Sequence, residues 1–259
     1  MADYWAQRFA ESQNTLSNKN IKQIEKQLAK YYMSAAKQII ADFEAVYDKI
    51  LAQKAEGKEV TPADLYKLES YWAMQGALRQ ELRKLGEKEI SLLNKYFEIN
   101  FFNIYYSINI EGKKAFNTIN AEGAQALINS IWVADGKSFS QRVWDNTDKL
   151  LETLNEQLLH CIITGKKTTQ LKQVLQERFG VSYNNADTIA RTELAHVQTI
   201  AAQERYKSYG ISEVQVWADA DERRCSECGK LHKKIYPAGA SVPIPAHPRC
   251  RCTILPVID

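Results

Sequence analysis

Metal-binding side chains crowd into a short stretch near the C-terminus. Residues 223–252 read RRCSECGKLHKKIYPAGASVPIPAHPRCRC and hold four of the chain's five cysteines and two of its four histidines. Such a stretch is compatible with a disulfide staple, a catalytic metal site or a structural zinc site. The choice decides how this part of the chain folds, because the residues after 210 have few large apolar side chains to bury.

The N-terminus bears on this choice. MADYWAQRFAESQ has neither an apolar core of signal-peptide length nor a basic run before one, and no stretch reaches about 18 uncharged apolar residues. We therefore expect a protein without a membrane span that is made in the cytosol and stays there. Cytosolic thiols are kept reduced, and clustered cysteines in that compartment hold metal more often than they form disulfides.

The spacing of the cysteines favours zinc. Cys225 and Cys228, followed by Gly229, have the form of a zinc knuckle, in which two thiolates reach one ion and the glycine lets the backbone turn toward the sulfurs. Eighteen residues separate Cys228 from His247, close to the separation between the two halves of a small zinc module. The two halves together predict one metal site.

Five side chains compete for the four positions of a tetrahedral zinc ion. Cys250 and Cys252 point to one face if their segment is extended, whereas a turn at Pro248 brings in the His247 imidazole. A thiolate-rich shell leaves no open position for substrate, so we expect a structural ion that contributes on the order of 10 kcal/mol to folding. The candidate ligands are Cys225, Cys228, His247, Cys250 and Cys252.

The first half of the chain follows the helical period. Apolar residues recur every three or four positions over 21–51, which predicts a long amphipathic helix. The letters TPAD at 61–64 are typical of a helix start, and this second helix should run to about 85, where Gly86 loosens or breaks it. A third segment from 87 to 110 is aromatic-rich at its end, which we expect to be buried or docked on a partner.

The second half ends in a change of period. Residues 212–219 and 253–258 alternate like strands of one small sheet, whereas the residues before Gly210 keep helical punctuation. The chain is therefore predicted to be mainly α, with long amphipathic helices followed by a small zinc-stabilised α+β module. Helices are expected around 120–132, over 141–163 ending at Gly165, over 168–180 ending at Gly180, and over 182–210. We place a boundary near Gly165, between a helical region over 1–165 and a C-terminal domain over 166–259, whose strand and loop module covers 211–259.

Few residues point to catalysis. Glu193 and His196 lie three apart on a predicted helix and can share one face, a pairing that is common by chance. The chain has no glycine-rich phosphate loop and no two-histidine zinc-protease pattern. No asparagine lies between Cys228 and His247, which argues against a histidine-asparagine-histidine nuclease. We expect no enzymatic activity and no small-molecule substrate.

The C-terminal third resembles the phage Mu F-like minor head proteins, also called the phage head-morphogenesis family. The resemblance rests on an Arg-Thr-Glu stretch at 191–193, a tryptophan strand at Trp217, the Asp-x-Arg-x-Cys-x-x-Cys segment at 221–228 and His-Pro-x-Cys-Arg-Cys at 247–252. The stretch IWVADGKSFSQRVWDN at 131–146 is similar to minor capsid proteins of phages and prophages of low-GC Gram-positive bacteria.

This resemblance implies a minor capsid protein that acts at the portal vertex in head morphogenesis and in DNA packaging or ejection. Its partners would be the portal and other head proteins, its place the virion or procapsid interior, and its site of synthesis the bacterial host cytoplasm. The formal net charge of +3 permits contact with packaged double-stranded DNA, through non-specific phosphate contacts. Candidate DNA-contacting residues are Arg223, Arg224, Lys230, Lys233, Lys234, Arg249 and Arg251.

Two other functions stay open. One is a zinc-ribbon DNA-binding regulator. The other is an effector or nuclease delivered with the genome, since some relatives in the family are fused to toxin domains. The sequence ends seven residues after Cys252, which we expect to leave no room for a C-terminal toxin.

Overall fold

The computed structural model describes residues 2–55, 61–116, 118–218 and 224–258. Within these ranges the chain is mainly helical and carries one small sheet near its C-terminus, as the sequence predicts. The elements in chain order are α1 (Ala2–Ala55), α2 (Pro62–Leu65), α3 (Glu69–Ser107), α4 (Ala121–Ile128), α5 (Phe139–Thr164), α6 (Thr168–Ser208), β1 (Glu213–Trp217), α7 (Ser226–Leu231), β2 (Ile235–Pro237) and β3 (Thr253–Pro256).

The chain divides into two units, each assembled from segments that are distant in the sequence. Residues 26–91 and 140–187 form the bundle unit. Residues 1–25, 92–139 and 188–259 form the sheet unit. The long helices contribute to both units, and the predicted domain boundary near Gly165 stays a prediction.

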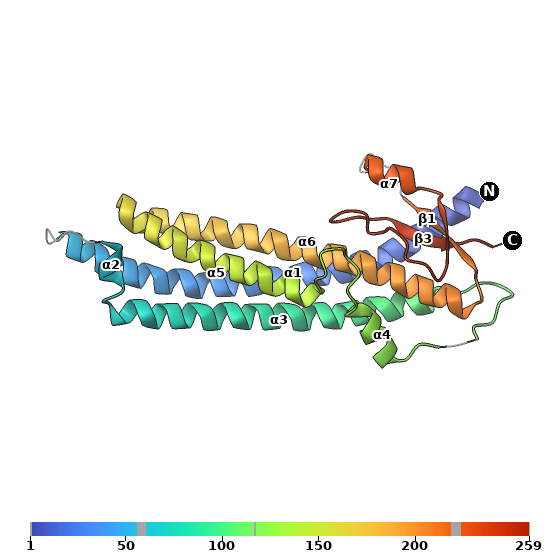
Figure 1. Ribbon diagram of the computed structural model, residues 1–259, viewed down its shortest axis with the longest axis horizontal. Helices are drawn as coiled ribbons and strands as arrows, with labels where there is room; N and C mark the ends of the chain where they lie inside the picture. The colour runs from blue at the N-terminus through green and yellow to red at the C-terminus, as the bar shows by residue number, and fades with distance from the viewer. Residues whose placement is uncertain (1, 56–60, 117, 219–223, 259) are drawn as a thin grey trace. The chain divides into compact units, whose positions relative to one another are not determined.

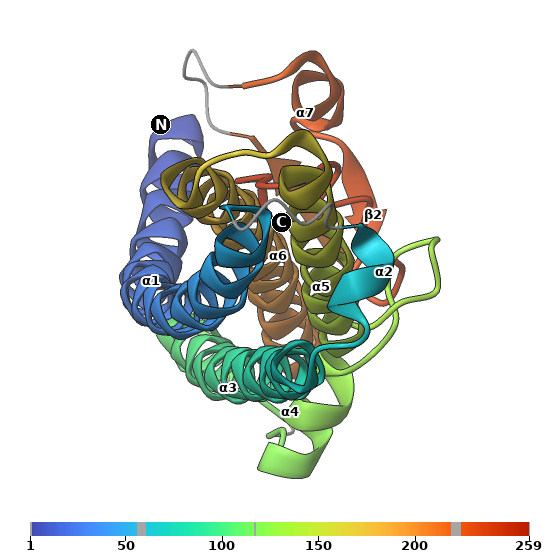
Figure 2. The same cartoon turned by 90° about the vertical axis from the view of Figure 1, so that its left-hand side faces the viewer.

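The bundle unit consists of stretches of α1, α3, α5 and α6 that run side by side around a common centre (Figure 2). Each stretch turns a stripe of large apolar side chains inward, because these residues recur at the three- and four-residue spacing of one helix face. The buried stripes include Ile39 and Phe43, Leu78 and Leu82, Leu150 and Leu154, and Leu171 and Leu175.

Gly86 does not break the helix, contrary to the prediction. α3 continues through this position because Gly86 leaves room for a neighbouring indole: a Cβ placed there would lie 2.6 Å from Cζ3 of Trp144 on α5. The glycine therefore serves close packing between two helices. The predicted start at Thr61 is confirmed, with the Thr61 amide donating to Asp64 Oδ2 at 2.9 Å, but the helix that begins there ends at Leu65 after one turn.

Gly180 is likewise not a helix stop. α6 runs unbroken from Thr168 to Ser208, since its buried stripe continues on both sides of the glycine, from Leu175 and Phe179 to Ala186. Burial of that stripe outweighs the roughly 1 kcal/mol that a glycine costs inside a helix. The helix predicted around 120–132 is confirmed as α4 but ends at Ile128, with Asn120 as its cap accepting from the Gly123 amide at 2.8 Å. The helix predicted over 141–163 is confirmed as α5, which ends before Gly165 with its φ of +61°.

The sheet unit carries the C-terminal strands. β1 lies between β2 and β3 and pairs antiparallel with both, with Val216 opposite Ile254. The two strands predicted over 212–219 and 253–258 are thus confirmed as neighbours, whereas β2 was not predicted because it has only three residues. The N-terminal part of α1 lies beside β1 and β3 (Figure 1), where Ala10 packs against Trp217 and Leu255.

One face of the aromatic end of α3 is buried within the sheet unit, whereas Tyr106 on this end is exposed. Phe97, Phe101 and Tyr105 are at most 1% exposed, and the Phe97 ring packs edge-on against Phe139.

Candidate metal centre

The first half of the candidate site lies at the start of α7. Cys225 is the N-cap of this helix, and its sulfur accepts a hydrogen bond from the Cys228 amide at 3.3 Å. The amide that faces the sulfur is therefore that of Cys228, and Gly229 lies inside the helix rather than in a turn after it. The two-residue spacer places both sulfurs on the same side of the first turn, with Cys228 buried.

The second half comes from the loop that leads into β3. The Cys250 amide donates to the His247 carbonyl at 3.1 Å, which closes a tight turn around Pro248. Arg249 adopts φ +60° inside this turn. Cys250 and Cys252 are both buried and belong to the same irregular segment, which ends where β3 begins.

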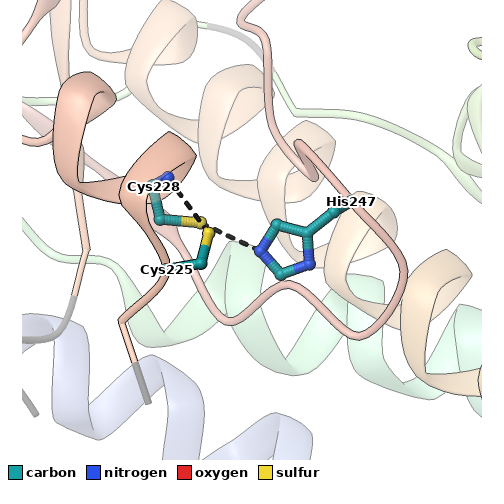
Figure 3. Close-up of side chains that lie close together, drawn as sticks. All are labelled: Cys225, Cys228 and His247. Atoms are coloured by element: carbon teal, nitrogen blue, oxygen red, sulfur yellow. Dashed lines mark hydrogen bonds between the residues drawn. The ribbon is translucent and has the colours of Figure 1, made fainter. Parts of the chain in front are cut away.

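The two halves meet around the sulfur of Cys228. His247 Nε2 lies 3.1 Å from Cys228 Sγ, and Cys250 Sγ lies 3.7 Å from it. Figure 3 shows the His247 imidazole pointing at the sulfurs of Cys225 and Cys228. Two triads of possible ligand atoms lie within 4.8 Å of one another: Cys225, Cys228 and His247, and Cys228, Cys250 and Cys252.

These separations suit a tetrahedral ion. Around zinc, with Zn–S of about 2.3 Å and Zn–N of about 2.0 Å, neighbouring ligand atoms lie roughly 3.5 to 3.8 Å apart. The Cys228–Cys250 separation of 3.7 Å falls in this range, and the His247 nitrogen needs to move outward by a few tenths of an ångström. All five cysteines of the chain are free thiols in this structure, so the disulfide staple is not formed. The cluster can therefore hold a metal ion.

Neighbouring groups shift the pKa values of the four clustered thiols in different directions. The Cys252 thiol donates to Cys250, which lowers the pKa of Cys250 to about 5 and raises the pKa of Cys252. The Cys228 amide lowers the pKa of Cys225 in the same way, whereas burial raises the pKa of Cys228 to about 12. A bound cation would favour the thiolate form of each ligand, since metal binding displaces the thiol protons.

His232, the remaining histidine of the stretch, has a structural role. Its Nδ1 accepts from the Ala218 amide at 3.2 Å, and its ring packs on Trp217. The sequence signal for this role is weak, because nothing in the spacing distinguishes His232 from His247.

The Arg-Thr-Glu stretch on α6 ties three segments of the sheet unit together. Arg191 forms an ion pair with Glu25 of α1, and the Thr192 hydroxyl accepts from the Arg249 amide at 3.0 Å. Glu193 accepts from the Trp132 indole N–H at 2.8 Å. The motif therefore holds the metal-site loop, the loop after α4 and the N-terminal helix against α6.

His196 shares a face with Glu193, as the spacing predicts, but both side chains pack on Trp132. The imidazole stacks on the indole with ring centroids 4.3 Å apart, and its burial lowers the pKa of His196 to about 3. A neutral, covered imidazole beside a carboxylate already bonded to an indole indicates packing rather than proton transfer.

The predicted DNA-contacting residues separate into groups. Arg223 lies outside the described residues. All of the others have exposed side chains, but their positions in the fold differ: Arg249 and Arg251 line a pocket together with Arg191, whereas Lys233 covers the Trp217 ring at 5.8 Å from its centroid. The sequence did not indicate that Arg191 belongs with the arginines of the loop, because 58 positions separate it from Arg249.

This constellation matches a known protein family. Residues 152–255 match the family described as phage Mu protein F like protein, a range that includes the Arg-Thr-Glu stretch, both halves of the cysteine cluster and the sheet. Residues 152–255 are therefore similar to the phage Mu protein F-like family.

A curated relative extends beyond this chain. The NAD(+)--arginine ADP-ribosyltransferase EFV of Enterococcus faecalis is 25% identical over 185 residues, which cover 64% of this chain. The chain spans 38% of that relative's length. No solved structure matches the chain. None of the helices in the described ranges is long and apolar enough to cross a membrane.

Proposed function

We propose that this protein is a minor head protein of a bacteriophage or prophage that acts with the portal in head assembly and in DNA packaging or ejection. The match of residues 152–255 to the phage Mu F-like family carries the proposal. The protein would lie in the procapsid or virion interior after synthesis in the host cytoplasm, with the portal and other head proteins as neighbours.

In this proposal the cysteine cluster holds one structural zinc ion that joins α7 to the loop before β3. The candidate donors form two triads that share Cys228, and soft sulfur donors favour zinc over magnesium or calcium. Cys228 belongs to both triads, so it is a ligand in either scheme. The other ligands of the ion come from Cys225, His247, Cys250 and Cys252.

The assembly role can be tested by co-expression with the portal and head proteins of the same phage. We expect the protein to purify with the portal or with procapsids, and heads made without it to be defective in assembly or in DNA retention. Intact heads of normal DNA content that form in its absence would refute the assembly role.

The similarity to the ADP-ribosyltransferase favours one further candidate, a head protein related to a genome-delivered effector. Incubation of the purified protein with labelled NAD+ and an arginine-rich acceptor distinguishes this effector-related candidate from the structural head protein. We expect no transfer of label. Acceptor labelling that grows with time and with enzyme concentration would assign an enzymatic function and overturn the structural proposal.

A further inference from the structure

The loop that supplies three of the candidate metal ligands also lines a pocket of about 520 Å³ in the sheet unit. α1 contributes Asn14 and Asn18 to its wall, α6 contributes Arg191, and the loop contributes Arg249 and Arg251. None of the described residues that line this pocket is acidic, although Arg191 is also ion-paired with Glu25 of α1. The pocket therefore brings together guanidinium and amide groups from three separate segments.

All three arginines line the same pocket although like charges repel. Burial and, after it, the charge of Arg249 lower the pKa of Arg191, as expected for two cations that line one pocket. The surrounding fold holds Arg249 in this position: its amide donates to Thr192 Oγ1 and its Nε to Thr188 Oγ1, each at 3.0 Å. Converging cations on a fixed loop are the arrangement of a preformed anion site.

We propose that this pocket binds a phosphate group of a nucleic acid backbone, with Arg191, Arg249 and Arg251 as the phosphate-binding residues. Planar guanidinium groups match the oxygens of a phosphate and donate two hydrogen bonds in parallel. The phosphate ligand follows from the pocket, whereas packaged DNA as its source rests on the proposed head function.

This assignment divides the basic residues of the C-terminal module. Lys230 and Lys234 are exposed but do not line the pocket, so they add only diffuse positive charge. Arg251 is exposed at the pocket wall, and it lies in the loop rather than on a helix face. Substituting Arg251 removes one positive charge from a residue that lines the pocket, and substituting Lys234 removes one from a residue that does not.

Fluorescence anisotropy with the full-length, zinc-loaded protein tests the proposal. With a labelled duplex of about 20 base pairs, Arg251→Gln should weaken binding about tenfold and reduce the slope of log K against log salt concentration by about 0.9, the loss of one phosphate contact. Lys234→Gln should stay within about twofold of wild type. Equal losses in the two variants, or no binding by wild type at about 50 mM salt, would overturn the phosphate pocket.

Two controls keep the result specific. Metal content and thermal unfolding must match wild type; if Arg251→Gln changes either, Arg191→Lys replaces it, since this variant keeps the charge and removes the guanidinium. Polyglutamate at the same charge concentration should displace the duplex poorly. Displacement as efficient as by unlabelled DNA would show that the pocket reads charge alone and would overturn the proposal.

Incorporation into procapsids separates this inference from the proposed function. A variant that loses duplex binding and still enters heads leaves the head function intact. Full duplex binding by a protein that never associates with head proteins would leave the pocket intact and refute the assembly role.

Discussion

The packing of Gly86 against Trp144 makes a quantitative test of the fold. An alanine Cβ at position 86 would lie 2.6 Å from Cζ3 of the indole and 3.0 Å from Cε3, about 1 Å inside normal contact between carbon atoms. The substitution forces the indole or α5 to move, which costs about 1–3 kcal/mol in packed sites. Against this, alanine favours the helix by about 1 kcal/mol. We expect Gly86→Ala to lower the free energy of unfolding by about 1 kcal/mol on balance.

Two glycines in the same unit serve as matched controls. At Gly76 in α3 and Gly180 in α6, no atom lies within 4 Å of the position that a Cβ would take, so alanine at either should stabilise the protein by up to about 1 kcal/mol. The assay is denaturant unfolding followed by circular dichroism, with the unfolding slope checked for each variant.

A double-mutant cycle isolates the contact. When Trp144 is replaced by alanine, the clash is absent and Gly86→Ala should become stabilising, a reversal of sign that corresponds to a coupling energy of about 1–3 kcal/mol. A stabilising Gly86→Ala in the wild-type background would show that the indole does not occupy this position, and the account of α3 and α5 would be wrong.

Three further predictions concern the site and the buried polar groups. Cys228→Ser should abolish zinc binding, measured by metal analysis, whereas Cys161→Ser, a buried thiol outside the cluster, should leave the zinc content unchanged. Burial raises the pKa of Glu89 to about 7, above its value in the unfolded chain. The contribution of protonated Glu89 to the free energy of unfolding is therefore complete below about pH 4.5 and is lost as pH rises through 7, by about 3 kcal/mol in all. Glu89→Gln should flatten this decline in unfolding curves measured across pH. Trp132→Phe keeps the ring over His196 but removes the N–H that Glu193 accepts, and should cost about 1–3 kcal/mol in chemical denaturation, whereas Trp5→Phe at an exposed position should be neutral.

Local patterns predicted the elements but misjudged how long the helices are. The period of the apolar residues located the helix over 21–51, and the helix start at Thr61 formed as predicted. Gly86 was misread because a glycine looks the same in sequence whether it ends a helix or admits a neighbouring side chain, and Gly180 was misread because burial of the stripe around it carries the helix through. Only the position of Trp144 on another helix distinguishes the two cases.

The sequence by itself predicted a metal site and a resemblance to phage head proteins. Cysteine and histidine spacing is local, so residues 225–252 predict a metal site, and the motif at 247–252 points to phage head proteins before any folding is considered. Tertiary structure decided which groups share that site. Cys228 became its centre, the Arg-Thr-Glu stretch became a tie between segments, and Arg191 came to line one pocket with Arg249 and Arg251. These relations join residues that are far apart in the chain, and contacts of that kind are set by how helices and loops pack rather than by periodicity or spacing.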